Sequence, residues 1–456
     1  MSTENRPTVL LSVETGAREL ASKLALASAL AAANLDVVLG HKEAVSAIGV
    51  ASRRIIWQGK SLFSLTDTHP LADRLLRNDS HIMFISDEGA MHQADSWEAQ
   101  TLHKHWVDHL RTRGVQRICL WGSRQGDVIA RYAPELASTL RVTGSPRFDM
   151  CLPHHAWTSS LDKANEAIPQ RPFMLFCTRF GAVAQARGIQ FPFVTKLNAK
   201  AWPAGMPAHG ISALWFSKWR QDAHDLAEFM MLIRAVAHRY PEYAIVVRPH
   251  PSENLAFYRE AFILEPNVMV IRDGSALDWI RAAALTIHTN CTTGVEAVMA
   301  SRPTINFRPP LASGERQDVE VAREAGTSVA SIPAALEAVD RALAGAPFAQ
   351  EWSEDARAML NNLNDEAIPR MVAETVTLVA ESGLDGSRLV MPRRFGLRAT
   401  TRRLLGRRDA DDYVAGKRGL LAANYVEQIL EGYRTRGLGR GVIRDICSTH
   451  VLIGPA

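Results

Sequence analysis

The sequence predicts an α/β protein of two Rossmann-like domains that face a cleft, followed by a helical, basic C-terminal tail. Short apolar runs alternate with helical patterns from the N-terminus, and the alternation begins again after Gln170. Such alternation is typical of a parallel sheet with helices on both faces. A chain of 456 residues is too long for one ordinary core and suits two. We place the domains at residues 1–160 and 161–385, and the tail at residues 386–456.

In the first alternation, runs of apolar and β-branched residues predict strands, and apolar residues every three or four positions predict helices. Several of these runs end at a glycine, such as Gly40 and Gly122, where an extended run is expected to turn. The strands are expected at Val9–Val13, Val37–Leu39, Ile55–Trp57, His81–Ile85, Arg117–Trp121 and Thr139–Thr143. The helices are expected at Ala17–Ala33, Pro70–Asn78 and Trp97–Arg113.

The second alternation repeats the pattern with a longer first helix. Its strands are expected at Phe173–Cys177, Tyr243–Arg248, Val268–Ile271, Leu285–Thr289 and Thr304–Phe307. Its helices are expected at Ser217–His238, Ser275–Ala284 and Val295–Ala300, and the tail should contain one more at Tyr413–Tyr433. In sheets of this kind ligands collect at the carboxyl ends of the strands. Functional residues should therefore follow strands directly.

Composition narrows the class of protein. The formal net charge of +4 is small for this length and does not suggest a nucleic-acid partner. The five cysteines are scattered without a CxxC pair, which argues against a disulfide framework and a structural zinc site and fits a reducing compartment. We see no signal peptide at the polar N-terminus and no run of about 18 apolar residues. These features predict a cytoplasmic protein.

The first candidate site is the run Val246–Glu253, which reads Val-Val-Arg-Pro-His-Pro-Ser-Glu after an apolar strand. Pro249 and Pro251 restrict the backbone and lack N–H groups, so the loop should be rigid and should present His250 in one direction. Arg248 and His250 can both donate to phosphate oxygens. A structural loop with a surface histidine is the alternative interpretation.

The second candidate site is the turn around Thr292, Thr293 and Gly294, where a strand ends and a helix begins at once. Such a turn offers backbone N–H groups, hydroxyls and the positive end of a helix dipole to an anion. Glu296 follows within the same helix. The alternative is that Thr292 or Thr293 caps the helix. Two anion-ready turns in one domain favour a nucleotide-phosphate site.

Other residues follow strands as well. Ser275 opens a helix as an S-x-x-D capping box, and its position near the phosphate site also suits a base or ribose contact. In the first domain, Asp87 and Glu88 precede Gly89 and suit a general base or nucleophile. The alternative for this pair is a solvated acidic turn.

Four further residues of the first domain are expected to face the cleft. Arg147 and Asp149 lie in the turn where the chain leaves the domain, and Glu14 and Arg18 follow the first strand. Lys60 also follows a strand and could meet an anionic substrate. The body of the fold has no DxD motif for a metal–diphosphate site, no P-loop, no GxGxxG and no GxSxG, which excludes NTPase, simple dehydrogenase and α/β-hydrolase chemistry.

Taken together in this order, the runs at Val13–Leu20, Gly59–Leu62, Asp87–Gly89, Gly144–Asp149, Val247–Glu253 and His288–Ala297 resemble the bacterial surface carbohydrate biosynthesis protein family. That family is similar to retaining β-Kdo glycosyltransferases of capsule and lipopolysaccharide assembly and, more distantly, to bacterial sialyltransferases of GT-B fold. The resemblance covers roughly residues 8–310. Its last two motifs are the most specific. Departures occur at Ser145 and at Ala90, and neither removes a reactive group.

The resemblance implies a GT-B glycosyltransferase that needs no metal and no cofactor and takes a CMP-linked acid sugar, most simply Kdo. Glu88 then matches the catalytic carboxylate, and His250-Pro251 with Thr292-Thr293 matches the CMP-phosphate site. A glycosyl-enzyme adduct on an aspartate is implied, with Asp149 as the candidate by position; whether Asp149 or Glu88 is the nucleophile stays open. The cations Arg147, Lys60, Arg248 and Arg18 would meet the sugar carboxylate or the acceptor.

The basic tail lies outside the resemblance. The Arg388–Arg408 stretch has arginines interleaved with apolar residues and could lie on an anionic membrane surface, at about 1 kcal/mol per basic residue. That would place the protein at the inner face of the cytoplasmic membrane, beside a lipid-linked glycan acceptor. The alternative is a solvated helix. Two other functions stay open: a CDP-glycerol-type glycerophosphotransferase and a non-catalytic subunit of glycan assembly.

Overall fold

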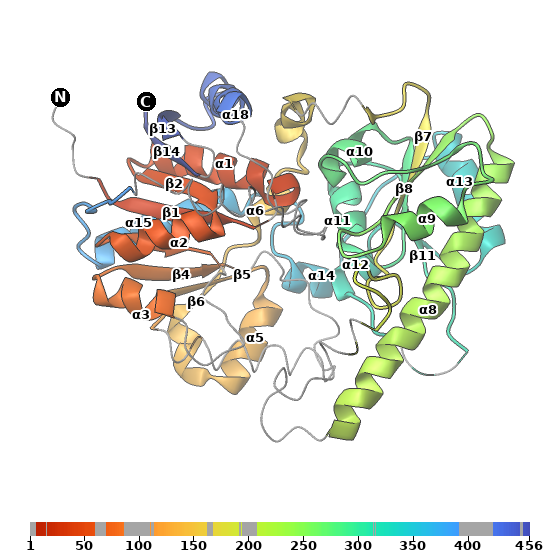
Figure 1. The fold of residues 1–456 in the computed structure, drawn as a ribbon, viewed down its shortest axis with the longest axis horizontal. Coiled ribbons are helices and arrows are strands. Elements are labelled where there is room, and N and C mark those ends of the chain that lie inside the picture. Colours follow the sequence, from red (N-terminus) through yellow and green to blue (C-terminus); the bar gives the residue numbers. More distant parts are fainter. Residues whose placement is uncertain are drawn as a thin grey trace, which may run out of the picture. The chain divides into compact units, whose positions relative to one another are not determined.

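The computed structural model describes residues 6–14, 16–59, 70–85, 110, 114–161, 167–190, 193, 208–312, 314, 316–391, 423–446 and 450–456. These residues form two compact units (Figure 1). The described residues before Cys151 and those from Asn364 onward make up the first unit, and those of Cys151–Leu363 make up the second. Each unit is built on one sheet.

The first unit has an eight-stranded sheet in the order β13-β14-β2-β1-β3-β4-β5-β6. Strands β1 to β6 are parallel to their neighbours, and β13 and β14 join antiparallel at the β2 edge. The strands are β1 Thr8–Val13, β2 Asp36–His41, β3 Ile56–Gln58, β4 His81–Ile85, β5 Arg117–Leu120, β6 Leu140–Val142, β13 Gly441–Ile446 and β14 His450–Pro455. The helices are α1 Gly16–Ala32, α2 Lys42–Ala51, α3 Pro70–Arg77, α5 Ser123–Tyr132, η1 Pro134–Thr139, α6 Pro146–Asp149, α15 Ile368–Glu381 and α18 Ala423–Thr435.

The C-terminal part of the chain returns to the first unit. Helix α15 is joined to the sheet by charged groups: Arg117 on β5 pairs with Glu374 and Glu381, and Arg141 on β6 also pairs with Glu374. Strand β14 pairs with β2, with Val451 opposite Leu39. A separate tail from residue 386 is therefore not what the described residues show, because the hairpin extends the first sheet and α15 covers it.

The second unit has a six-stranded parallel sheet in the order β12-β11-β10-β7-β8-β9. Its strands are β7 Phe173–Cys177, β8 Ala244–Arg248, β9 Val268–Val270, β10 Leu285–His288, β11 Thr304–Phe307 and β12 Thr327–Val329. Its helices are η2 Pro153–Leu161, α8 Ala208–Arg239, α9 Leu255–Ala261, α10 Ala276–Ala282, α11 Thr292–Met299, α12 Glu320–Arg323, α13 Ile332–Leu343 and α14 Glu354–Met359. This strand order is the 3-2-1-4-5-6 order of the doubly wound fold, and its direction reverses between β7 and β10.

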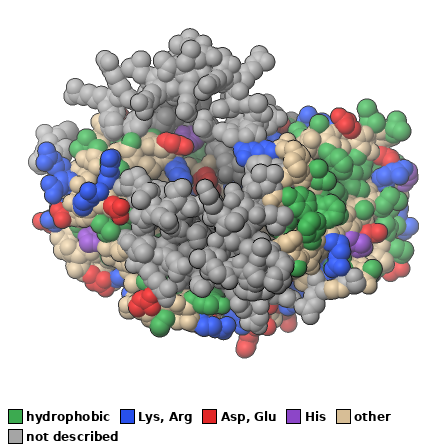
Figure 2. Space-filling view, turned by 60° about the horizontal axis from the view of Figure 1, so that its bottom comes forward, with side chains coloured by type: hydrophobic (Ala, Val, Ile, Leu, Met, Phe, Trp, Pro, Cys, Tyr) green, Lys and Arg blue, Asp and Glu red, His purple; other side chains and the backbone are tan. Residues whose placement is uncertain are grey.

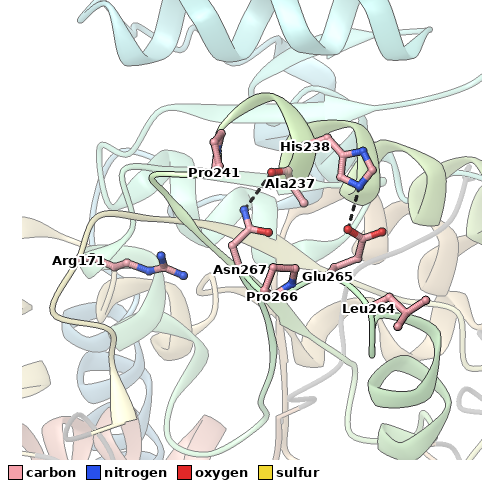
Figure 3. A pocket seen from close by; sticks show the side chains of 8 residues that line it. All are labelled: Arg171, Ala237, His238, Pro241, Leu264, Glu265, Pro266 and Asn267. Atoms are coloured by element: carbon pink, nitrogen blue, oxygen red, sulfur yellow. Dashed lines mark hydrogen bonds and ion pairs between the residues drawn. The ribbon is translucent and has the colours of Figure 1, made fainter.

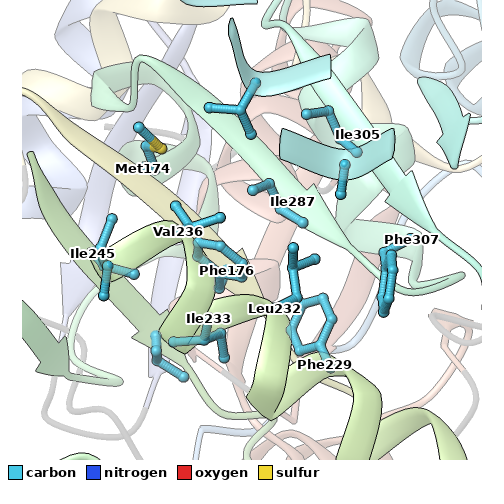
Figure 4. Close-up of a cluster of buried hydrophobic side chains, with 14 of the residues drawn as sticks. Met174, Phe176, Phe229, Leu232, Ile233, Val236, Ile245, Ile287, Ile305 and Phe307 are labelled. Atoms are coloured by element: carbon cyan, nitrogen blue, oxygen red, sulfur yellow. The ribbon is translucent and has the colours of Figure 1, made fainter. Parts of the chain in front are cut away.

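Burial of apolar side chains between α8 and the sheet holds the second unit together. Phe176 on β7 and Ile287 on β10 point toward Phe229, Leu232 and neighbouring residues of α8 (Figure 4). All four side chains are fully buried. The aromatic rings of Phe176 and Phe229 meet nearly edge to face, with centroids 5.6 Å apart. This packing fixes the carboxyl ends of the central strands, where ligands of such folds bind.

The predicted α/β class with two Rossmann-like units is confirmed. The ends of the predicted strands differ from the observed ones by at most two residues, and α8 begins nine residues before the predicted Ser217. Apart from Leu110, the predicted helix Trp97–Arg113 lies outside the described residues, and so does most of the Arg388–Arg408 stretch. Among the residues that are described, no helix has both the length and the apolar character needed to cross a membrane.

Candidate functional site

Two of the predicted loops begin at the same edge of the second sheet, after the strands on either side of β7. In the register of the sheet, Cys177 at the end of β7 lies opposite Arg248 at the end of β8 and opposite His288 at the end of β10. With neighbouring strands about 4.8 Å apart, the loops after β8 and β10 start roughly 10 Å from each other. His250 and Thr292 therefore belong to loops at one edge of the sheet, and the loop after β7 begins between them.

The loop after β8 holds His250 by one ring nitrogen. The backbone N–H of Ser252 donates to Nδ1 at 3.2 Å, and the hydroxyl of Ser252 lies 2.8 Å from the same nitrogen. A backbone N–H can only donate, so Nδ1 is the acceptor and the neutral ring carries its proton on Nε2. The side chain of His250 is exposed. Its fixed tautomer makes Nε2 a hydrogen-bond donor toward an anion.

The buried carboxylate of Glu253 holds this loop in place through hydrogen bonds. Its carboxylate is fully buried and accepts hydrogen bonds from the Thr178 hydroxyl (2.6 Å), the Phe180 N–H (2.6 Å) and the Tyr258 hydroxyl. Burial raises the pKa of Glu253 to about 7. The Thr178 hydroxyl also accepts the N–H of His250 at 3.2 Å. The rigidity expected from the two prolines thus comes in large part from Glu253 and its donors.

The loop after β10 leads into the start of α11. The side chain of Cys291, the residue before the helix, caps no backbone N–H of the helix, and its Sγ lies 3.3 Å from the Thr293 hydroxyl. Thr292 and Thr293 are the first two helical residues and are half-buried. The N–H of Gly294 is bonded to the Cys291 carbonyl at 2.9 Å. Neither threonine caps the helix, so the alternative interpretation of these residues as caps does not apply, and Gly294 contributes no N–H to a ligand.

His288 explains why position 294 is a glycine. The fully buried imidazole accepts the N–H of Cys291 at Nδ1 (3.1 Å) and donates from Nε2 to the Ala325 carbonyl (2.9 Å). A Cβ atom at Gly294 would lie 2.2 Å from Nε2. The ring therefore occupies the space that a side chain at 294 would need. Histidine and glycine together set the position of Cys291, which precedes the first turn of α11.

The burial of His288 predicts a loss of stability in acid. Burial lowers the pKa of His288 from 6.5 to about 4, so between these two pH values the unfolded chain binds a proton that the folded chain does not. Stability should then fall as the pH drops from 6.5 to 4, by about 3 kcal/mol from this group. Denaturant unfolding of wild type and His288→Gln at several pH values measures it. Equal pH profiles of the two proteins would contradict this role of His288.

Arg248 and Ser275 are engaged within the protein. The guanidinium of Arg248 is buried and donates to the carbonyls of Asp273 (2.7 Å), Gly274 (3.0 Å) and Arg272 (3.3 Å). Burial lowers the pKa of Arg248 to about 10. The Ser275 hydroxyl accepts the N–H of Leu277 at 3.3 Å and so caps α10. These contacts support the predicted capping role of Ser275 and make Arg248 a residue that positions the 272–274 loop.

Glu296 and Pro251 complete the predicted set in this unit. Glu296 lies on α11 and is 5 % exposed, so its side chain lies largely inside the unit. Pro251 is exposed, and its carbonyl accepts a hydrogen bond from Arg272 at 3.2 Å. The same guanidinium nitrogen donates to the Glu253 carbonyl, so Arg272 holds the loop that carries His250.

Arg179 is a residue of this edge that the sequence analysis did not single out. It follows β7 directly and donates to the Thr289 carbonyl at 2.7 Å, which ties the end of β7 to the end of β10. Two aspartates of α8, Asp222 and Asp225, pair with its guanidinium. Both carboxylates are buried, and Arg316 also pairs with Asp225, at 2.6 Å. The rule that functional residues follow strands could have identified Arg179 as well as His250, since both lie in loops after strands of the second sheet.

In the first unit, Asp149 has a structural position. Its side chain is fully buried, and its two carboxylate oxygens accept the backbone N–H groups of Ala367 (2.9 Å) and Ile368 (2.7 Å) at the start of α15. A carboxylate there is favoured by the helix dipole. Both oxygens are committed to these bonds, which argues against the predicted role as a nucleophile, and we do not carry that role further.

The remaining predicted residues of the first unit are only partly described. Glu14 ends the β1 region and its N–H donates to the carboxylate of Glu19 at 2.9 Å. Arg18 lies on α1 rather than in a loop, and Arg147 lies on α6; both are half-buried. Asp87, Glu88 and Lys60 lie outside the described residues. So does the tail beyond residue 391 up to residue 422, whereas Arg388 pairs by its backbone with Arg53.

A pocket of about 500 Å³ lies at the opposite, amino edge of the second sheet (Figure 3). It is lined by Arg171, Ala237, His238, Pro241, Leu264, Glu265, Pro266 and Asn267, which precede the strands. His238 is paired there with Glu265 at 2.8 Å. Because ligands of doubly wound folds bind at the carboxyl edge, we do not place the functional site in this pocket.

On the face shown in Figure 2, the described Lys and Arg side chains lie among Asp and Glu and do not form one continuous basic patch.

Comparison with known proteins finds similar folds at low identity. No protein-family model matches the chain, and no curated protein matches it. A Methanocaldococcus jannaschii UDP-GlcNAc 2-epimerase, solved with UDP-GlcNAc and UDP, is 12% identical, with a TM-score of 0.46 over 81% of this chain and 99% of that one. The Neisseria meningitidis UDP-GlcNAc 2-epimerase, bound to UDP-GlcNAc, is 12% identical, with a TM-score of 0.43 over 83% and 98%. Anabaena Alr3699/HepE, solved with UDP and glucose, is 11% identical, with a TM-score of 0.38 over 82% and 100%. Likeness at this level does not show what this chain does.

Proposed function

We propose that this protein is a metal-independent glycosyltransferase of bacterial surface polysaccharide synthesis that transfers an acid sugar, Kdo, from a CMP donor to a glycan acceptor. The observation that supports it best is that the His250 loop and the start of α11 follow the strands on either side of β7, at the carboxyl edge of the second sheet. The helix end has no side-chain cap, and His250 offers a proton from Nε2. An uncapped helix N-terminus and an imidazole N–H donor suit the binding of a single phosphate group.

In this proposal the second unit binds the leaving nucleotide. The phosphate lies against Thr292 and Thr293, where backbone N–H groups and the helix dipole favour negative charge. His250 donates from Nε2 to a phosphate oxygen, and this hydrogen bond strengthens as charge develops on the departing CMP. Glu253 and Thr178 act as positioning residues, since they hold the His250 loop.

The sugar end of the donor needs other groups. Its carboxylate calls for a cation, and Arg147, Lys60 and Arg18 are the candidates from the first unit. The reacting carboxylate is Glu88, with Asp87 beside it; both assignments rest on the motif resemblance. Arg388–Arg408 is a candidate for contact with anionic lipid near a lipid-linked acceptor. A donor with one phosphate needs no divalent ion to neutralise a diphosphate.

Donor hydrolysis tests the proposal. Purified protein is incubated separately with CMP-Kdo, CMP-sialate, CDP-glycerol and UDP-GlcNAc, and release of the nucleotide is followed by chromatography. We expect cleavage of CMP-Kdo without added metal and in the presence of EDTA. Preference for CDP-glycerol would identify a glycerophosphotransferase instead. A chain that cleaves none of these donors, and whose Glu88→Gln variant still complements a deletion strain, would act as a non-catalytic subunit.

A further inference from the structure

Asn290 departs from ordinary protein structure in two independent ways. It has a left-handed backbone with φ of 48°, a conformation that asparagine adopts more readily than most residues but that still costs a residue with a Cβ free energy. Its side chain is fully buried, and neither Oδ1 nor Nδ2 has a hydrogen-bond partner in the described structure. Buried amides almost always find partners. Unfavourable features of this kind cluster at functional sites.

The position of Asn290 is the switch point itself. It lies between the end of β10 and the first turn of α11, one residue before Cys291. The hydroxyl of the preceding Thr289 is likewise buried and without a partner. Cys291 and Thr292, by contrast, are half-exposed. Two unsatisfied polar side chains therefore lie next to the turn at which we place the phosphate.

The surrounding structure holds Asn290 in this conformation. Its backbone N–H donates to Oδ1 of Asn306 at 2.9 Å. The amide nitrogen of Asn306 in turn donates to the carbonyls of Ala322 and Arg323, each at 3.1 Å. Asn306 is therefore fixed by two bonds and can hold the turn. The strain at Asn290 is maintained by its neighbours and is not relieved by a contact of its own side chain.

We propose that Asn290 takes part in ligand recognition: its amide binds a hydroxyl-bearing group attached to the phosphate, such as a ribose or sugar ring. A neutral amide offers both donors and an acceptor, and a hydroxyl does the same, whereas a bare phosphate offers only acceptors. The inference rests on the proposed phosphate site for its ligand, but not on the identity of the base or the sugar. Ligand binding would satisfy groups that the ligand-free protein leaves unpaired.

The substitution Asn290→Gly distinguishes a role in ligand recognition from a structural role. Glycine accepts a positive φ without strain and removes the unpaired amide, so the ligand-free variant should melt higher than wild type, by roughly 2–4 °C. At the same time its affinity for CMP, measured by titration calorimetry, should fall roughly 10- to 100-fold. A side chain that stabilised the fold would give a lower melting temperature.

Two further variants control the test. Asn34→Gly removes another positive-φ asparagine, with φ of 64°, that is exposed and accepts a bond from Arg6, and it should leave CMP affinity unchanged. Asn290→Asp keeps the size of the side chain and should also weaken CMP binding, through repulsion of the phosphate.

The outcomes distinguish this inference from the proposed function. If wild type binds UDP-GlcNAc but not CMP, the proposed donor class fails, and Asn290→Gly is then judged on UDP-GlcNAc. A lower melting temperature of ligand-free Asn290→Gly overturns the inference, and so does an unchanged affinity for the ligand that wild type binds. Failure of wild type to bind either compound contradicts both proposals.

Discussion

The His250→Ala variant should lose donor cleavage by roughly 10²- to 10³-fold in kcat/KM, the usual effect of removing one donor to a developing oxyanion. The physical reason is the fixed tautomer: Ser252 occupies Nδ1, so the proton on Nε2 is the one that reaches the phosphate. The ring lies on the surface of its loop, and its loss should leave the fold intact. Steady-state hydrolysis of CMP-Kdo, with circular dichroism as a check of folding, measures the effect.

A matched histidine controls for this substitution. His238 lies in the last turn of α8, at the opposite edge of the same sheet, and is paired with Glu265. His238→Ala should retain full activity. His250→Gln keeps a side-chain N–H donor and should recover part of the loss. If His250→Ala cleaves the donor at the wild-type rate, the loop that carries His250 is a structural element and does not bind the leaving group.

The Gly294→Ala variant should have the largest effect on stability, about 4–5 kcal/mol. An alanine Cβ would lie 2.2 Å from the buried imidazole of His288. Overpacking a core of this kind costs about 3 kcal/mol. Displacement of the ring would also break its bonds to Cys291 and Ala325, at about 1 kcal/mol each. Chemical denaturation of the purified variant gives the loss directly.

Gly126 provides the control for Gly294. It lies in helix α5, where an added Cβ would meet the flexible tips of Leu120 at 3.2 Å and Leu140 at 3.9 Å. Gly126→Ala should be neutral or slightly stabilising, because alanine is the better helix former. A Gly294→Ala protein as stable as Gly126→Ala would show that His288 moves aside at little cost, and that it does not set the position of the helix start.

The sequence was sufficient for most of the strands and for the loops that follow them, although it did not indicate β12, β13 or β14. The runs Phe173–Cys177, His81–Ile85 and Thr304–Phe307 were predicted to the residue, because short apolar runs bounded by turns leave little choice of structure. His250 and Thr292 were predicted by the rule that ligands bind after parallel strands. That both loops begin at one edge, on either side of β7, follows from the strand order, which the sequence does not contain.

Residues whose role depends on distant partners were not predictable. Asp149 after β6 reads the same whether it attacks a substrate or caps a helix, and α15 begins more than 200 residues later along the chain. No strand was predicted after Tyr433, yet the C-terminal residues form a hairpin, which pairs with the edge of the sheet at β2 through β14. Asn290 carries no signal in the sequence either, since both its φ and its missing partners are properties of the fold.

A crystal structure of the protein with CMP tests the central claim most directly. We predict that the phosphate lies within hydrogen-bonding distance of Nε2 of His250 and of the backbone N–H groups of Thr292 and Thr293, at the carboxyl edge of the second sheet. A phosphate bound in the pocket around Arg171 and His238, at the amino edge, would contradict the claim. So would a CMP whose phosphate contacts neither the His250 loop nor the start of α11.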